Sequence, residues 1–178
     1  MTTRLKNLLS RFRKDETGSA TVEFVLHFSV LVTILAASVE LSNINIRHAM
    51  LERAVDVAVR DIRLNTGQTP TFESVRATIC EEARIIDGCE SNLMLEMKQV
   101  DPTNFTPLPA VPDCINAQEE PRPVRDFVAG QDNDLMLIRA CLKYNPIFPS
   151  TPLALALDMD ENGYAKMIVN SAFVQEPR

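Results

Sequence analysis

The feature that most constrains this chain is an uninterrupted apolar run over residues 19–39. The run reads SATVEFVLHFSVLVTILAASV and contains no glycine, no proline and one formal charge, Glu23. At about 1.5 Å per residue, a helix of this length spans roughly 31 Å, close to the hydrocarbon thickness of a bilayer. We therefore expect a transmembrane helix. A buried helix of a soluble protein is the weaker interpretation.

The charges on either side of this run predict its orientation. Residues 1–18 hold five basic and two acidic side chains, whereas residues 19–178 hold 13 basic and 22 acidic ones. Basic flanks favour the cytoplasmic side of a membrane, so the N-terminus is expected inside the cell and the C-terminal part outside it. Ordinary signal-peptide cleavage is disfavoured, because the apolar core is too long and Ala36-Ala37-Ser38 is a mediocre site.

The helical pattern continues beyond the apolar run. Residues at alternating spacings of 3 and 4 form a heptad seam: Leu41, Ile44, His48, Leu51, Val55, Ala58 and Ile62. Toward the N-terminus, the same spacing continues through Ala37, Ile34, Val30, His27, Glu23 and Ala20. Charged residues that include Glu40 and Arg47 occupy the other faces, which we expect to meet water.

One unbroken helix is expected from Ser19 to Leu64, because no glycine or proline interrupts this stretch. It would be about 69 Å long. Asn65-Thr66-Gly67 then supplies a stop, and Pro70 follows. We expect the outer half to pack on its own domain along one face, while the continuous seam suits packing beside other helices.

Glu23 needs a partner, because a carboxylate inside a bilayer is costly. It is the fifth residue after Gly18. A cut after Gly18 would give Ser19 a free ammonium near the cytoplasmic membrane face, and Glu23 of a neighbouring subunit could neutralise it. Such a pair is strong in a low-dielectric setting, where either charge alone is penalised.

These residues resemble the type IV pilin superfamily, which has a basic leader, a glycine at the cleavage point, glutamate at mature position five and an apolar helix. Glu23 followed by Phe24, with a long leader and a small Ser19, is most similar to the TadE-like minor pilins (pseudopilins) of tight-adherence (Tad/Flp, type IVb) systems. The resemblance covers residues 11–64. It implies that Gly18 ends the leader, Ser19 begins the mature chain, and Glu23 and Phe24 act in assembly. Type IVa pilins usually have phenylalanine where this chain has Ser19, so N-methylation stays open.

The resemblance also implies a function. The chain would be a substrate of a prepilin peptidase, an intramembrane aspartic protease in this family, and not an enzyme; no cofactor is implied. Further partners would be other minor and major pilins, the inner-membrane pilus assembly platform and membrane lipid, in a Flp-type pilus for surface attachment. The protein would lie in the bacterial inner membrane with its domain in the periplasm, or enter the pilus. Partner helices would pack on the seam residues Val30, Ile34, Ala37, Leu41 and Ile44.

Both histidines lie on the predicted helix. His27 follows Glu23 by four residues, on the same face. It is either a pH-tuned partner of that carboxylate or a neutral, hydrogen-bonded helix residue, and we favour the second interpretation. His48 is expected to be packed or capped.

The exported part predicts an α+β domain with a small antiparallel sheet against the helix. A second helix is expected over about 71–85, ended by Asp87-Gly88-Cys89. Strands are expected over 93–100, 134–144 and 164–174. Asn162-Gly163 favours a type I′ hairpin with a preceding strand at 153–159, although a short helix capped by Thr151-Pro152 is the alternative there. Residues 101–124 contain six prolines and indicate a long irregular loop.

Four cysteines, Cys80, Cys89, Cys114 and Cys141, all lie on the exported side. An even number in an oxidising compartment predicts two disulfides, for which three pairings are possible. We favour Cys80–Cys89, which closes a helix-to-strand corner and is similar to the TadE-like pattern, together with Cys114–Cys141. No CxxC-type spacing favours a metal.

Two other functions remain open. One is an unprocessed single-pass anchor that acts as an envelope assembly or sensor subunit. The other is a tethered periplasmic ligand- or calcium-binding module, since residues 158–163 imitate the start of a calcium loop. Val169 stands where that loop needs glutamate, however, and a turn explains Asn162-Gly163 without a metal.

Composition argues against other classes. The net charge of −6 disfavours nucleic-acid binding, and no GxSxG, HExxH, Walker or dinucleotide motif occurs. The expected organisation is a basic cytoplasmic leader at 1–18, a transmembrane helix at 19–39, its amphipathic continuation at 40–66 and an exported α+β domain at 67–178.

Overall fold

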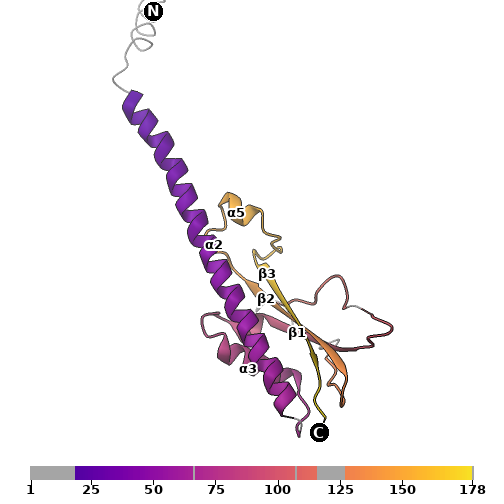
Figure 1. The fold of residues 1–178 in the computed structure, drawn as a ribbon. Coiled ribbons are helices and arrows are strands. Elements are labelled where there is room, and N and C mark those ends of the chain that lie inside the picture. Colours follow the sequence, from indigo (N-terminus) through magenta and orange to yellow (C-terminus); the bar gives the residue numbers. More distant parts are fainter. Residues whose placement is uncertain (1–18, 66, 107, 116–126, 178) are drawn as a thin grey trace, which may run out of the picture.

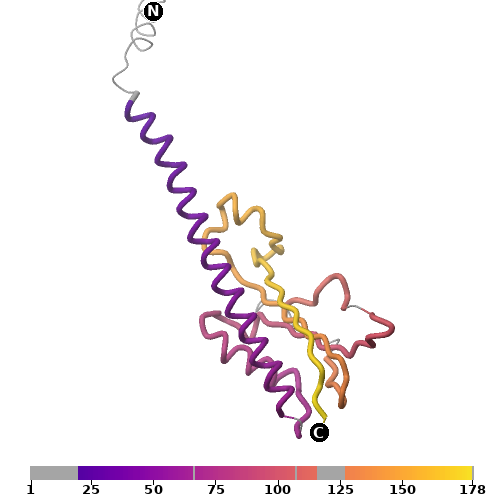
Figure 2. The backbone as a smooth tube through the Cα atoms, viewed as in Figure 1, coloured from indigo at the N-terminus to yellow at the C-terminus, as the bar shows by residue number. Residues whose placement is uncertain are grey.

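The molecule consists of one long helix and a small domain packed on the C-terminal half of that helix (Figure 1). The computed structural model describes residues 19–65, 67–106, 108–115 and 127–177. The N-terminal half of the helix projects away from the domain, so the two halves have different surroundings (Figure 2). This arrangement confirms the predicted α+β class.

The long helix α2 runs without interruption over Ser19–Leu64, as the sequence predicts. Helix-breaking residues are missing from its 46 positions, so nothing local interrupts the hydrogen-bond ladder. At its end, the Asn65 amide N–H donates to the carbonyl of Asp61 at 2.9 Å. The Asn65 side chain also donates to the Asp61 carboxylate at 2.7 Å. The chain then leaves the helix axis and turns back toward the domain.

The outer half of α2 supplies one wall of the core. Its buried residues recur at helical spacing: Leu51, Ala54, Val55, Ala58, Val59 and Ile62. Four of them belong to the predicted seam, so the expected packing on the chain's own domain is confirmed. By contrast, residues 20–35 of α2 are exposed on every side.

Helix α3 (Phe72–Glu82) packs against this buried face through Val75 and Ile79. A reciprocal capping box starts it: the Ser74 amide donates to the Thr71 hydroxyl, and the Thr71 amide donates to the Ser74 hydroxyl. The helix ends three residues before the predicted 85, because the chain leaves helical geometry at Ala83. Gly88, in the left-handed conformation at φ 65°, then opens the short helix α4 (Cys89–Asn92).

The sheet has the predicted three strands, β1 (Leu93–Val100), β2 (Leu135–Tyr144) and β3 (Ala165–Val174). They lie antiparallel in the order β1-β2-β3. Leu93 pairs with Leu142, and Leu135 pairs with Val174. Strand β3 packs on α2. β1 and β2 are buried on both faces, because α2 and α3 cover one face and the proline-rich segment contacts the other.

The proline-rich segment contains neither helix nor strand over 101–106 and 108–115, as predicted. Its residues 116–126 lie outside the described part of the chain. The segment is tied to the sheet at Pro109, whose carbonyl accepts a 2.8 Å hydrogen bond from Arg139 of β2.

The predicted strand at 153–159 is wrong, and the helical alternative is correct. Helix α5 (Pro152–Leu155) forms there, with Thr151 capping it and Pro152 in its first turn. A single bridge between Met159 and Ala165 is what remains of the expected hairpin. Large apolar residues occupy every second position of LALALDM, which is typical of a strand. The small alanines between them also fit a helical turn, and the preceding Pro152 favours the helix.

The turn at Asn162-Gly163 also differs from the predicted type I′. Gly163 has φ 80°, but Asn133 is the one non-glycine residue in the described chain with positive φ. Asn162 therefore lacks the conformation that a type I′ turn requires. The Asp160 carboxylate shapes this turn instead, since its Oδ1 accepts the amide N–H groups of Asn162 at 3.0 Å and Tyr164 at 2.9 Å.

Candidate assembly site

The projecting half of α2 exposes an apolar surface on all sides. Phe24, Val30 and Ile34 are 64%, 59% and 58% exposed. The helix is long and apolar enough to cross a membrane, and its own domain buries none of the most apolar window. Apolar side chains in such number are stable only in lipid or against other helices.

Polar side chains inside this run are mostly satisfied by the helix itself. The hydroxyls of Ser29, Thr33 and Ser38 each donate at 2.8 Å to a carbonyl of the preceding turn. Such bonds allow serine and threonine to enter a bilayer at little cost. Glu23 has no equivalent option, because a carboxylate has no proton to donate to a carbonyl.

His27 bonds to the backbone of Glu23 and not to its carboxylate. The Nδ1 atom of His27 donates to the Glu23 carbonyl oxygen at 2.8 Å. This geometry fits the neutral, hydrogen-bonded helix residue that we favoured. Within the described part of the chain, the Glu23 carboxylate has neither a hydrogen bond nor an ion pair.

Phe24 lies beside Glu23 and stacks on Phe28. The two ring centroids are 5.4 Å apart and the ring planes differ by 18°. An aromatic pair at this spacing stiffens the first turns of the helix at the level of the glutamate.

Two predicted site residues lie at the start of the described chain. Ser19 is the first residue of α2. Gly18 lies outside the described residues. The structure therefore places the expected mature N-terminus and Glu23 on one continuous helix, one turn apart.

The predicted seam divides between two environments. Val30, Ile34 and Leu41 are exposed, and Ala37 is half-buried. Ile44, by contrast, packs against the core of its own domain. The exposed part of the seam therefore ends near Leu41, and from Ile44 onward the helix packs on its own domain.

Glu40 marks this change, and its predicted place on a water-facing side is wrong. The residue is 0% exposed, and its Oε2 accepts the amide N–H of Phe148 at 2.9 Å. The loop after β2 covers this face of α2, which removes Glu40 from water. Its hydrogen-bonding partner lies 108 residues away, so no local sequence pattern indicates the contact.

Tyr144 and Arg47 lie close to Glu40. The Arg47 guanidinium lies over the Tyr144 ring, 5.7 Å from its centroid. Burial raises the pKa of Tyr144 above its ordinary value of 10.0, the negative charge of Glu40 raises that pKa further, and Arg47 lowers it. These contacts fix the position of the domain relative to α2.

His48 is less buried than the seam predicts. Its side chain is 41% exposed, and its Nδ1 lies 3.4 Å from the Glu52 carboxylate. The first fully buried seam residue is Leu51, one turn further along.

Two disulfides close the C-terminal domain, with the predicted pairing. Cys80 of α3 is joined to Cys89 of α4, which leads directly into β1. Cys114 of the proline-rich segment is joined to Cys141 of β2. The second bridge fastens a segment without regular structure to the centre of the sheet.

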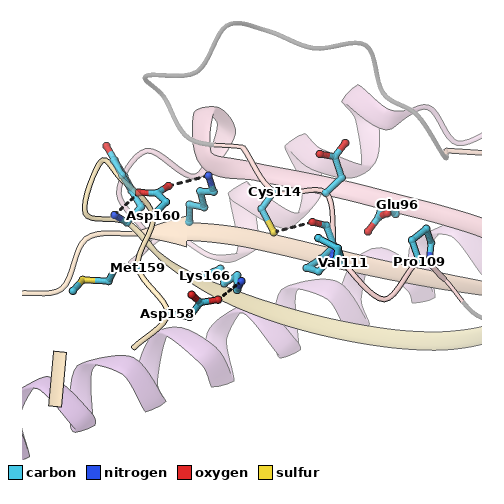
Figure 3. Close-up of a pocket in the computed structure, with 12 residues that line it drawn as sticks. Glu96, Pro109, Val111, Cys114, Asp158, Met159, Asp160 and Lys166 are labelled. Carbon is cyan, nitrogen blue, oxygen red and sulfur yellow. Dashed lines mark hydrogen bonds and ion pairs between the residues drawn. The ribbon is translucent and has the colours of Figure 1, made fainter. Parts of the chain in front are cut away.

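Asp158, Met159 and Asp160 of the imitated calcium loop line a cleft of about 490 Å³ beside the sheet (Figure 3). Asp160 forms an ion pair with Lys143 at 2.9 Å, and Asp158 forms one with Lys166. Lysine ammonium groups thus already neutralise both carboxylates. This pairing and the backbone bonds to Asp160 explain the segment as a turn.

The geometry of the N-terminal helix agrees with a comparison against known families. Residues 18–60 match the family model described as TadE-like protein. Over this helix, the chain is similar to TadE-like proteins. The match confirms the resemblance drawn from Gly18, Glu23 and Phe24, and it extends as far as the part of α2 that packs on the domain. Comparison with curated proteins and with solved structures gives no match.

The TadE-like match associates the chain with Tad pilus systems. It implies that the chain interacts with other components of such a system. Among the described residues, one helix is long and apolar enough to cross a membrane, which together with this match suggests a single-pass membrane protein. Residues 61–178, which include the whole α+β domain after α2, lie beyond the matched region.

Proposed function

We propose that this TadE-like protein is a minor pilin, or pseudopilin, of a tight-adherence pilus. A prepilin peptidase would cut between Gly18 and Ser19, and the mature helix would then join other pilin helices. The observation that carries the proposal is the Glu23 carboxylate, which has no partner in the described chain and lies on the exposed helix that matches the TadE-like family.

The proposed assembly step follows from the electrostatics of α2. Cleavage creates an ammonium on Ser19 near the cytoplasmic face of the membrane. In a helix bundle, Glu23 of one subunit would pair with the Ser19 ammonium of its neighbour. This pairing would offset the desolvation penalty of each charge in the bilayer. The exposed seam residues Val30, Ile34 and Leu41 would pack against the same neighbour. The assembly platform and the major pilins would supply the remaining contacts.

The proposed orientation places the leader in the cytoplasm and the domain in the periplasm. Charge asymmetry around the apolar run supports it. So do the two disulfides, because such bonds persist in oxidising compartments and all four cysteines lie beyond the membrane helix.

The main alternative is a single-pass anchor that is never processed. This interpretation also explains the membrane helix, but it does not explain the unpaired carboxylate of Glu23. The calcium-binding alternative is weaker, because Lys143 and Lys166 already pair with the carboxylates that it would need.

Replacing Glu23 tests the proposal. Glu23→Ala should leave membrane insertion intact, because it makes the run more apolar, but should abolish recovery of the protein in sheared pili. Glu23→Gln keeps the size of the side chain but removes its charge, and this variant should also be absent from sheared pili. Asp56→Ala, an exposed change on the outer half of the same helix, is the matched control. Normal recovery of both Glu23 variants in pili would refute the assigned role.

A further inference from the structure

An uncharged segment lies on the domain at the end nearest the membrane helix. Residues 145–157 read NPIFPSTPLALAL and contain no acidic or basic side chain, in a chain that is 24% charged. The segment joins β2 to β3 and includes α5. Figures 1 and 2 show it beside α2, where the projecting half of the helix begins.

The segment is fixed at the level of Glu40. The Phe148 amide donates to the buried Glu40 carboxylate at 2.9 Å. A tight turn follows, in which the Thr151 amide donates to the Phe148 carbonyl at 3.1 Å. Helix α5 packs on α2 and buries Ala154 completely. These contacts hold the segment one residue beyond Val39, the last residue of the apolar run.

The segment also exposes apolar side chains. Leu155 is 70% exposed, Ile147 48% and Phe148 38%. Pro149 and Pro152 are exposed beside them. Ala154 and Leu155 are neighbours on α5, so this short helix buries one side chain and exposes the next.

We propose that segment 145–157 lies in the outer-leaflet interface of the lipid bilayer while α2 spans the membrane. The proposal rests on α2 crossing the bilayer, and it needs neither cleavage nor entry into a pilus. The polar headgroup layer adds about 5–7 Å to each side of the hydrocarbon core. A segment fixed one residue past the apolar run lies within this layer. It can bury its leucine, isoleucine and phenylalanine side chains there without desolvating a charge. Because it carries no lysine or arginine, its binding does not require anionic lipid.

The chain offers a clean test, because it contains no tryptophan. Leu155→Trp places a single indole in the segment. Val174→Trp is the control, since Val174 is also an exposed apolar residue, 49% exposed. Its neighbour Gln175 donates to the Ile62 carbonyl, which lies 22 residues beyond Glu40, or roughly 33 Å along the helix. Each full-length variant is reconstituted into phosphatidylcholine vesicles with plain or brominated acyl chains.

The Leu155→Trp indole should emit at shorter wavelength than the Val174→Trp indole and lose about half or more of its emission in brominated lipid, because interfacial burial reaches about 5–10 Å into the acyl boundary. The Val174→Trp indole should lose none. Ile147→Trp should repeat the Leu155→Trp result if the substitution at Leu155 disturbs α5.

Equal emission of Leu155→Trp and Ile147→Trp in the two lipids would overturn the proposal. A blue shift without quenching would also overturn it, since the segment would then be covered by protein, such as a second copy. Phe28→Trp, near the centre of the apolar run 19–39, distinguishes failure of this inference alone from failure of the membrane-spanning assignment. If that indole is quenched and those of the segment are not, only this inference fails. If it is not quenched, α2 does not span the bilayer and the proposed function fails as well.

Discussion

Glu23 and Glu40 are two carboxylates on one helix with opposite surroundings. Glu23 is exposed and has no partner within the described chain, whereas Glu40 is buried and bonded to the Phe148 amide. Glu23 is therefore available to another subunit, and Glu40 is already used to hold the chain's own domain. The assembly role proposed for Glu23 can be read from the sequence, because its spacing from Gly18 is a local pattern. The burial of Glu40 could not be predicted from the sequence, because it depends on a loop that follows β2.

The ionisation of Tyr144 reports the Glu40 contact. Because burial and Glu40 raise its pKa above 10.0, the unfolded chain ionises first as the pH rises, and the free energy of unfolding should fall above that pH. Glu40→Gln should lower the pKa of Tyr144, and Arg47→Gln should raise it. Phenolate absorbance measured in a Tyr164→Phe background isolates this group, because the chain has two tyrosines. An unchanged titration in Glu40→Gln would place the carboxylate away from Tyr144.

At the scale of elements, most boundaries were predictable from local rules. The absence of glycine and proline predicts the limits of α2, and the alternation of apolar residues predicts the three strands. The strand expected at 153–159 was wrong, because a short alternating run fits both structures and the chain around Pro152 decides between them. The bond from Glu40 to Phe148 then fixes this loop on α2, a long-range contact with no local signature.

The buried pair Glu96–Arg139 joins β1 to β2 beneath the proline-rich segment. The two residues are cross-strand partners, and their side chains are 6% and 9% exposed. Arg139→Met should reduce the free energy of unfolding by about 3–5 kcal/mol, because it leaves a buried carboxylate without its counter-ion. The double variant Glu96→Leu/Arg139→Met should recover most of the loss. Thermal unfolding of the detergent-solubilised protein measures both, and equal losses in the single and double variants would contradict the pair's importance.

The two disulfides should contribute unequally to stability. Their sequence separations are 9 and 27 residues, and loop-closure entropy grows with this length. Replacing Cys80 and Cys89 by alanine should cost about 2.7 kcal/mol, and replacing Cys114 and Cys141 about 3.6 kcal/mol. Denaturant unfolding of the two double variants under matched conditions compares them. A smaller loss for Cys114/Cys141 would show that the proline-rich segment is held by its other contacts.

At the scale of the whole molecule, a helix with a free apolar half carries a domain on its other half. In the proposed assembly, lipid would cover the free half first and other helices would cover it afterwards. The surfaces through which the domain would contact other proteins are not encoded in the helix pattern.

The central claim is that the chain acts after cleavage between Gly18 and Ser19, when a new amine can meet Glu23 of a neighbour. Intact-mass spectrometry of the protein extracted from membranes that contain its own pilus machinery tests this most directly. The mature chain should begin at Ser19 and retain both disulfides. A protein that keeps residues 1–18 in those membranes would contradict the claim and favour the unprocessed anchor.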